Sequence, residues 1–347
     1  MPPVRLRRPV YAVTAPAPLR RLPAALLRWY DENRRDLPWR HQVSPYRTWV
    51  SEIMLQQTRV AAAEPYFLRF MAAFPTVADL AKADTEQVLR LWQGLGYYSR
   101  ARNLHAAAKQ IAAAGRFPDT LDGIRALKGV GDYTAAAIGS IAFGLPAAVV
   151  DGNVYRVLAR YFGIAEPIGT PQGKRIFTAR AQELLPPGQA ADFNQGMIDF
   201  GAIQCTPQHP DCPSCPLQRT CRAFLEGRTT LLPVKKAGPA IRQRFFTYLY
   251  IRCQGQTAFR KRPAGDIWQG LWEPLLFEGP LPEAYGNAVL LKKGVRHALT
   301  HRLIVADFYF LETTKKPSLP DGWIWMDEKM PAQLGKPRLV EHLLSLL

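Results

Sequence analysis

Residues 127–135 read LKGVGDYTA, a short glycine-containing turn that leads into an alanine-rich stretch. Gly129 and Gly131 allow the backbone to approach another group closely, and the N–H groups at a helix N-terminus attract anions. Because no strand is predicted before this turn, a dinucleotide-binding loop is not favoured. The stretch therefore predicts two helices joined by a hairpin that can hold DNA phosphates without reading bases. A plain turn between two helices is the alternative.

The composition also points to a polyanionic partner. The chain has 347 residues, which exceeds the usual size of a single core, so we expect two domains. It carries 45 Lys and Arg residues against 28 Asp and Glu residues, a formal net charge of +17. This excess favours nucleic acid as the partner, and a solvated surface without a partner is the alternative. No apolar run approaches the roughly 20 residues needed to cross a bilayer, so we expect no membrane association.

Four segments are predicted along the chain. Residues 1–21 contain five prolines, five arginines and no acidic residue, which is typical of a disordered basic arm. Residues 22–226 have a helical pattern, and residues 227–243 are polar and predict a linker. Residues 244–347 contain aromatic and β-branched runs typical of strands, followed by a final helix. The predicted fold class is therefore multi-domain, with an all-α domain followed by a smaller α+β domain.

Two acidic residues are candidates for chemistry. Glu52 lies in the mostly apolar stretch 49–55, where desolvation should raise the pKa of its carboxyl group and suit it to a general acid. A glutamate at the edge of a core, paired with an arginine, is the alternative. Asp151 lies in the sequence VDGNV (150–154), and its simplest interpretation is an N-cap of the following helix.

Two stretches carry side chains suited to nucleic acid. The polar residues that follow Glu52 would be unusual in a core but can donate hydrogen bonds to nucleic-acid edges; they are Gln56, Gln57 and Thr58. The sequence GLGYYSRARN (94–103) interleaves tyrosines and arginines after a glycine loop. Such a loop can insert into a base stack while its arginines contact phosphate. A helix start with a surface aromatic residue is the alternative.

Four of the five cysteines are clustered with the spacing C-x6-C-x2-C-x5-C, at Cys205, Cys212, Cys215 and Cys221. We expect an intracellular protein with reduced thiols, so the cluster predicts a metal centre rather than disulfides. The spacing alone leaves zinc and a 4Fe–4S cluster open, and His209 could contribute to a mixed zinc site.

The order of these motifs closely resembles the MutY-type adenine DNA glycosylase family of the endonuclease III superfamily. The resemblance runs from about Leu26 to the C-terminus, and it is carried by LPWR, SEIMLQQT, GLGYYSRARNL, GVGDYTAAAI, DGNVYRVLAR, FNQGMIDFGA and the cysteine spacing. It implies a helix-hairpin-helix glycosylase domain whose four cysteines hold one structural 4Fe–4S cluster. It also implies a monomeric, bacterial, cytoplasmic and nucleoid-associated enzyme of base excision repair that acts on double-stranded DNA.

The resemblance further implies roles for individual residues. Glu52 would protonate adenine at N7. Asp151 would stabilise the oxocarbenium-like sugar or form a transient covalent bond with it. Tyr133 and Asn153 would orient these two carboxyl groups. The implied adenine-pocket residues are Trp39, Arg40 and Asp199. The implied DNA-binding residues are Gln56, Gln57, Thr58, Leu95, Tyr97, Gly129 and Gly131, with Arg219 and Arg222 in the cysteine loop.

Two features of the resemblance concern specificity. Tyr133 stands where bifunctional relatives have a lysine, which implies a monofunctional glycosylase. The C-terminal part resembles the MutT-like domain that recognises 8-oxoguanine opposite adenine, and the matching residues are His297, Leu299, Thr300 and His301. The implied substrate is adenine mispaired with 8-oxoguanine or guanine.

The sequence after Gly265 contains no Nudix box, so we expect no nucleotide hydrolysis. A bifunctional glycosylase/lyase and a non-enzymatic iron–sulfur DNA-binding protein are the alternatives.

Overall fold

The computed structural model describes residues 17–236, 241–299 and 301–347, and these residues form two compact units. The first unit comprises the residues up to 37 together with 119–124 and 131–236. The second unit comprises residues 38–118 and 125–130 and the chain from 237 to its end. The predicted basic arm lies mostly outside the described residues, but helix α1 begins at Ala17, inside the segment predicted to be disordered.

The first unit is helical. It contains α1 (Ala17–Asn33), α9 (Asp132–Phe143), α10 (Gly152–Phe162), α11 (Pro171–Leu184), α12 (Ala190–Asp199), the π-helix η1 (Phe200–Gln204), the 3-10 helix η2 (Gln218–Thr220) and α13 (Arg222–Leu225). Its core forms because α10 places apolar side chains at i, i+3 and i+4 spacing, namely Val154, Val157, Leu158 and Tyr161. These pack with residues of α1, α11 and α12. Leu232, which is 4% exposed, belongs to the same core, so the helical unit extends past residue 226, where the sequence predicted its end.

The second unit begins with a group of helices. They are α2 (Pro38–His41), α3 (Pro45–Leu55), α4 (Val60–Ala73), α5 (Val77–Lys82), α6 (Thr85–Leu91) and α7 (Ser99–Ala114), and α8 (Leu121–Arg125) lies at the boundary between the two units. Helix α3 starts where Ser44 Oγ accepts a hydrogen bond from Arg47 N at 3.2 Å, with Pro45 in the first turn. Helix α7 ends at Gly115, whose φ of 73° suits glycine. None of the described helices is long and apolar enough to span a membrane.

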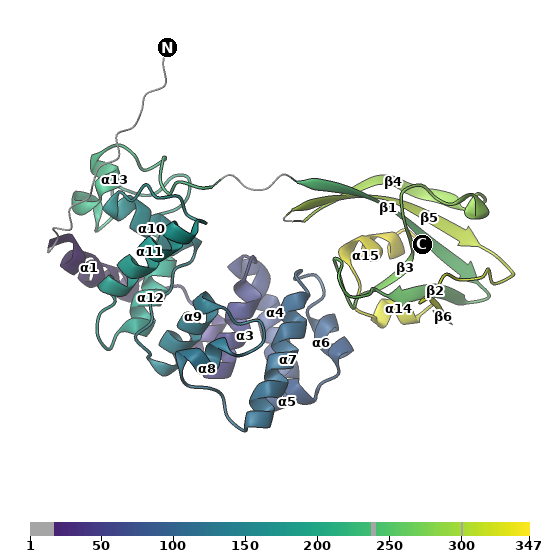
Figure 1. Cartoon of the computed structure of the whole chain (residues 1–347), viewed down its shortest axis with the longest axis horizontal. Helices are drawn as coiled ribbons and strands as arrows, with labels where there is room; N and C mark the ends of the chain where they lie inside the picture. Colours follow the sequence, from purple (N-terminus) through teal and green to yellow (C-terminus); the bar gives the residue numbers. More distant parts are fainter. Residues whose placement is uncertain (1–16, 237–240, 300) are drawn as a thin grey trace, which may run out of the picture. The chain divides into compact units, whose positions relative to one another are not determined.

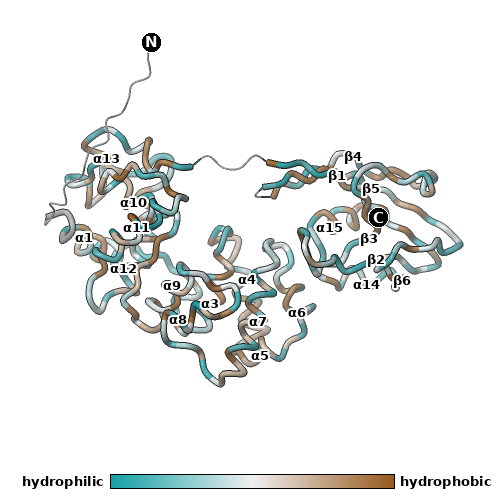
Figure 2. Tube along the Cα trace, viewed as in Figure 1, coloured by the Kyte–Doolittle hydropathy of each residue, from teal (hydrophilic) through white to brown (hydrophobic). Residues whose placement is uncertain are grey.

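The C-terminal part of the second unit is a six-stranded sheet (Figure 1). The strands are β1 (Arg242–Cys253), β2 (Gln256–Lys261), β3 (Trp272–Glu278), β4 (Val289–Ala298), β5 (Arg302–Glu312) and β6 (Ile324–Asp327), in the order β4-β5-β1-β3-β2-β6. Strands β1 and β5 are parallel, and the other pairs are antiparallel. Hydrophobic and hydrophilic residues are interleaved along the helices and strands, as expected for elements with one buried side (Figure 2).

Two short helices complete the sheet domain, α14 (Met330–Gln333) and α15 (Arg338–Leu344). Helix α15 buries Leu339, Val340 and Leu343 in a core that includes Phe246 and Phe308 of the sheet. Between β3 and β4 the described chain forms only the three-residue 3-10 helix η3 (Glu283–Tyr285). The connection is therefore too short for a long helix at this position.

The sheet domain contacts helix α6 within the second unit. Glu86 Oε1 accepts a hydrogen bond from Gly335 N at 3.0 Å, and Glu86 Oε2 accepts one from Trp272 Nε1 at 3.2 Å. Lys261 Nζ lies 3.0 Å from Glu86 Oε2. One helical carboxylate thus receives three donors from three segments of the sheet domain.

Candidate functional site

The predicted hairpin lies between α8 and α9. Leu127 and Val130 are buried, and the intervening Lys128 and Gly129 are exposed. Gly129 has a φ of 80°, and a Cβ there would lie 2.6 Å from Asn103 Cβ, so the close approach requires glycine. Gly131 is exposed and is the N-cap of α9. The turn therefore presents backbone to solvent at a helix N-terminus, as a phosphate contact needs.

Asp151 is held by the start of α10. Its Oδ1 accepts hydrogen bonds from the backbone N–H groups of Asn153 and Val154, both at 2.8 Å, so it is the N-cap that the sequence predicted. Its Oδ2 accepts a third bond from Asn153 Nδ2 at 2.8 Å. Burial raises the pKa of Asp151, while these hydrogen bonds and the charge of Arg156 act in the opposite direction. Asp151 is thus a poorly hydrated carboxylate in a fixed orientation.

Arg156 connects this carboxylate to the cysteine loop. Its Nη2 donates to Asn153 Oδ1 at 2.8 Å and to Gly201 O at 2.5 Å. Its Nε donates to Cys205 O at 2.7 Å. A Cβ on Gly201 would lie 2.6 Å from Asn153 Cβ, so the π-helix η1 can reach α10 only because residue 201 is glycine. Arg156 therefore anchors Asn153, η1 and the first cysteine together.

Arg160, one helical turn further along α10, continues this connection. Its Nη1 lies 3.4 Å from Cys205 Sγ and donates to Thr206 O at 2.7 Å. Its Nη2 donates to Pro207 O at 3.0 Å, and its Nε donates to Leu232 O at 3.1 Å. Neither Arg156 nor Arg160 was predicted from the sequence. Their i, i+4 spacing, within a helix that is otherwise apolar on that side, was the available signal.

The four clustered cysteines line one small cavity beside α10, with Arg160, Tyr161 and Phe200 among its other walls. Burial raises the pKa of the Cys212, Cys215 and Cys221 thiols, that of Cys215 to about 12, and the neighbouring cysteines add to the increase. Nowhere in the described parts of the chain are three or more His, Cys, Asp or Glu side chains arranged to hold a metal ion. His209 is exposed.

The residues predicted to line an adenine pocket occupy different environments. Trp39 is 8% exposed, with its ring edge-on to Phe67 at 5.4 Å, and Arg40 is half-buried. Asp199, the last residue of α12, is fully buried and pairs with Arg35 of the same unit. Arg35 Nη2 lies 2.6 Å from Asp199 Oδ1, and Arg35 N donates to Asp199 Oδ2 at 3.0 Å. This arginine was not predicted from the sequence.

Glu52 and Tyr133 lie in different units. Glu52 is 9% exposed and lies on α3 within the buried run from Trp49 to Met54. Tyr133 is half-buried in the first turn of α9. Glu52 is thus buried on α3, and its role as a general acid stays a prediction.

Arg100 joins the two loops that carry the predicted DNA-binding residues. Its guanidinium is buried and donates to backbone carbonyls at the end of α3 and in the loop before α7; these acceptors are Ile53, Met54, Gln56, Leu95 and Gly96. It also donates to Thr58 Oγ1 at 3.2 Å. The expectation that this arginine contacts phosphate was therefore wrong, because its donors are used inside the protein. Gln57 and Tyr97 are exposed, whereas Leu95 is 8% exposed and supports the loop from within.

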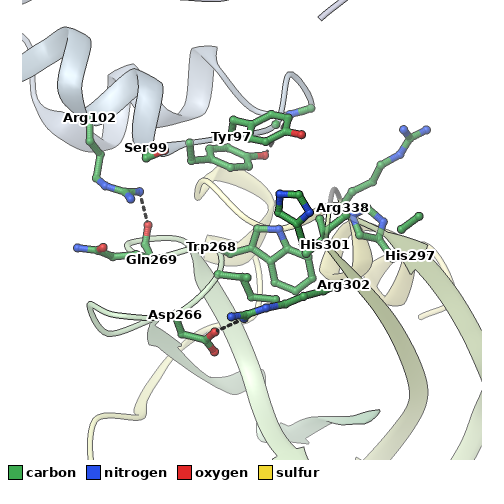
Figure 3. Close-up of a pocket in the computed structure, with 16 residues that line it drawn as sticks. Tyr97, Ser99, Arg102, Asp266, Trp268, Gln269, His297, His301, Arg302 and Arg338 are labelled. Carbon is green, nitrogen blue, oxygen red and sulfur yellow. Dashed lines mark hydrogen bonds and ion pairs between the residues drawn. The ribbon is translucent and has the colours of Figure 1, made fainter. Parts of the chain in front are cut away.

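A pocket of about 510 Å³ lies between this loop and the sheet domain within the second unit. Its walls include Tyr97, Ser99 and Arg102 on one side, and Trp268, His297, Leu299 and His301 on the other (Figure 3). The structure thus brings the predicted residues Tyr97, His297, Leu299 and His301 to one pocket. Thr300 lies outside the described residues.

Two families match consecutive parts of the chain. Residues 50–187 match a family described as HhH-GPD superfamily base excision DNA repair protein, and residues 247–346 match a family described as NUDIX domain. A solved thermostable thymine-DNA glycosylase has a TM-score of 0.56 and 31% identity, covering 60% of this chain and 97% of that one. A non-covalent endonuclease III–DNA complex has the same fold, with a TM-score of 0.52 and 24% identity over 60% of this chain and 96% of that one. The predicted fold class is confirmed.

Several curated proteins that are similar to this chain are named adenine DNA glycosylase. The adenine DNA glycosylase of Rattus norvegicus is 46% identical over 223 residues, which are 60% of this chain and 43% of the rat protein. The human adenine DNA glycosylase is 46% identical, with 38% of its length covered, so the chain matches less than half of these mammalian relatives. The adenine DNA glycosylase of Buchnera aphidicola subsp. Acyrthosiphon pisum is 33% identical over 344 residues, covering 92% of this chain and 95% of that protein. With its helix-hairpin-helix region, its Nudix-like sheet domain and this match over nearly its whole length, the chain belongs to the adenine DNA glycosylase family.

Proposed function

We propose that the protein is a monofunctional DNA glycosylase that removes adenine mispaired with 8-oxoguanine or guanine in double-stranded DNA. Family membership supports the class of reaction. The observation that carries the proposal is the Asp151 carboxylate, which is partly buried, oriented by three hydrogen bonds and anchored through Asn153. Such a fixed negative charge is what a sugar that becomes positively charged in the transition state requires.

The reaction can be derived from the two carboxyl groups. A duplex hides the adenine glycosidic bond, so the nucleotide must first be flipped into a pocket. Glu52, in its apolar surroundings, donates a proton to adenine N7, and the C1′–N9 bond then breaks with its electron pair going to the base. Asp151 stabilises the positive charge on the sugar. Water adds to C1′ and returns a proton to a carboxylate, which leaves free adenine and an abasic site.

The tyrosine at position 133 supports a reaction that leaves the DNA strand intact. Lyase chemistry in bifunctional glycosylases needs an amine that forms a Schiff base with C1′, and a phenol cannot form this bond. Because residue 133 is a tyrosine, we propose that the product is an intact strand with an abasic site. Nucleotide hydrolysis is not proposed, because η3 spans three residues where a catalytic Nudix helix would be needed and the sequence lacks the Nudix glutamates.

The pocket between Tyr97 and the sheet domain is proposed to receive the base opposite adenine. Its volume of about 510 Å³ is in the usual range for small-molecule sites. Its walls combine aromatic rings with the imidazoles of His297 and His301, which can stack on a purine and bond to its edge. The hairpin turn at Gly129 and Gly131 is proposed to hold phosphate.

The cysteine loop is proposed to hold a 4Fe–4S cluster with a structural role. Its four thiols share one cavity, and the raised pKa values of Cys212, Cys215 and Cys221 mean that these three need a cationic centre to be thiolates at neutral pH. Arg160, 3.4 Å from Cys205 Sγ, would stabilise the negative charge on the sulfurs. The cluster would supply order to residues 205–221, so that the exposed Arg219 and Arg222 can reach the DNA backbone.

Base release under single-turnover conditions tests this proposal. Duplexes would carry adenine opposite 8-oxoguanine, adenine opposite guanine, or thymine opposite guanine, because one structural relative is a thymine-DNA glycosylase. We expect release of adenine from the first two and no release of thymine. Strand breaks should form only after alkali treatment. Thymine release, or strand breaks without alkali, would contradict the proposal.

A further inference from the structure

Four non-glycine residues in the described part of the chain have a left-handed backbone. They are Gln57, Tyr97, Gln254 and Trp268, with φ values of 58°, 49°, 50° and 58°. Gln254 has a local reason, because it forms the tight β1–β2 turn together with Gly255, whose φ is 73°. The other three have no such hairpin. A left-handed backbone is unfavourable for bulky side chains and is concentrated at functional sites in proteins.

Two of these three residues are already candidates for contact with DNA. Gln57 and Tyr97 match the residues that insert beside the lesion base in the family, and both are exposed. Trp268 lines the same pocket as Tyr97 but was not identified from the sequence. In the view of Figure 3 its ring lies at the centre of the pocket, with Tyr97 above it and Arg302 below it.

The loop that carries Trp268 is fixed from several sides. Arg262 Nε donates to Ile267 O at 2.9 Å, and Leu271 N donates to Trp268 O at 3.0 Å. Asp266 accepts hydrogen bonds from Arg244 at 2.6 and 2.9 Å. From helix α7, Arg102 Nη1 donates to Gln269 O at 2.6 Å. The backbone is therefore held in its left-handed conformation before any ligand arrives, as preorganised binding requires.

The Trp268 ring itself is packed only in part. Phe246 lies edge-on to it at 6.3 Å, and the guanidinium of Arg262 lies 5.9 Å from its centroid. In the pocket it contacts the imidazole of His297, edge-on at 5.7 Å. The ring thus supports a polar pocket residue while its remaining surface is half-exposed.

We propose that Trp268 is a specificity-determining residue, an aromatic wall that contacts the base opposite the excised adenine and orients His297 toward the edge of that base. This inference rests on the proposed function. An oxidised purine differs from guanine in the polar groups of its imidazole edge, whereas both bases present a flat face to the ring. The difference at the edge is used only when the base is docked against Trp268 with His297 beside that edge, so removal of the ring lowers the preference for the oxidised base.

Trp268→Asn tests the role of the ring, because asparagine tolerates the left-handed backbone. Gln254→Asn is the matched control at the hairpin turn. Binding would be measured at one salt concentration to duplexes that pair a non-excisable 2′-fluoro-adenosine with 8-oxoguanine or guanine. We expect the preference of Trp268→Asn for 8-oxoguanine to fall about 5- to 100-fold, as for loss of one specific contact to the edge of a base. Gln254→Asn should keep the wild-type preference.

A second variant guards against a folding defect. Trp268→Leu keeps an apolar group against Phe246, and it should lose preference to a similar extent with a melting temperature close to that of the wild type. Retention of the wild-type preference by either folded variant would overturn the inference. This outcome is distinct from failure of the proposed function, in which the wild-type protein itself would release no adenine.

Discussion

The guanidinium of Arg156 donates a hydrogen bond from Nε to the backbone carbonyl of Cys205 at 2.7 Å. The same side chain donates to Asn153 Oδ1, and Asn153 in turn donates to Asp151 Oδ2. The first cysteine of the cysteine loop and the carboxylate proposed to act on the sugar are therefore linked through two side chains. The orientation of Asp151 depends in this way on the order of the cysteine loop.

Arg156→Lys should weaken this link while it keeps the positive charge. Lysine cannot bond to Asn153, Gly201 and Cys205 at once, because it lacks the planar fork of arginine. We expect the single-turnover rate of adenine release to fall about 10- to 100-fold, as for other residues that orient a reacting group. Arg175→Lys, on α11, is the control. A variant rate within a factor of two of the wild type would show that the link is not needed.

Asp151→Asn should distinguish the role of Asp151 in adenine release from its role in the stability of the fold. Asparagine caps a helix as well as aspartate does, but it has no charge to stabilise the sugar, and we expect adenine release to fall by about 10²-fold or more. Because burial raises the pKa of Asp151 in the folded state, ionisation of this group costs stability as the pH rises through that pKa. The melting temperature of the variant should therefore increase relative to that of the wild type between about pH 4 and pH 7. A decrease over this range would contradict the assigned environment.

Arg100→Met should destabilise the second unit and loosen both loops that carry the predicted DNA-binding residues. Five carbonyl groups would lose a charged donor, and each such bond contributes about 1.5–3 kcal/mol. We expect the free energy of unfolding to fall by at least about 3 kcal/mol, measured by chemical denaturation. The exposed Arg116→Met is the control and should change it by less than about 0.5 kcal/mol. Equal effects of the two changes would refute the role assigned to Arg100.

Much of the fold could be predicted because each motif is a short continuous stretch of the sequence. The runs RFFTYLYIRC (244–253), TAFRKR (257–262) and HRLIVADFYFLE (301–312), predicted as strands, correspond to β1, β2 and β5, and the predicted final helix corresponds to α15. Strands β3, β4 and β6 were not predicted. Strand β4 is mostly exposed, so it lacks the alternation of apolar residues that reveals a half-buried strand.

The supporting residues of the site were not predictable in the same way. Arg35, Arg100 and Arg156 act through contacts with residues 42 to 164 positions away. Arg100 and Arg156 bond mainly to backbone carbonyls, which carry no side-chain signature, and Arg35 bonds to the carboxylate of Asp199, 164 positions away. Glu52 and Asp151 were identified because short motifs surround them. Their mutual arrangement still rests on the resemblance.

The helical core ends later in the chain than the sequence predicted, and this affects where a truncated protein should end. The linker was predicted to begin at residue 227, yet Leu232 is buried in the helical core and Ile168 N donates to Val234 O at 2.9 Å. A chain that ends at residue 236 should therefore melt at a higher temperature and keep more iron than one that ends at 227, since burial of one leucine contributes about 2–3 kcal/mol. Equal melting temperatures would show that residues 228–236 do not stabilise the helical unit.

Adenine release is tested most directly by identifying the base that the protein frees from a duplex with adenine opposite 8-oxoguanine. The measurement is chromatographic detection of free base in a single turnover, with the wild-type protein and with Glu52→Gln, which keeps the shape of the side chain but cannot donate the proton. We expect stoichiometric adenine from the wild type and a rate about 10²- to 10⁴-fold lower for the variant. It is contradicted if the wild type binds the duplex without releasing adenine, or if Glu52→Gln releases adenine at the wild-type rate.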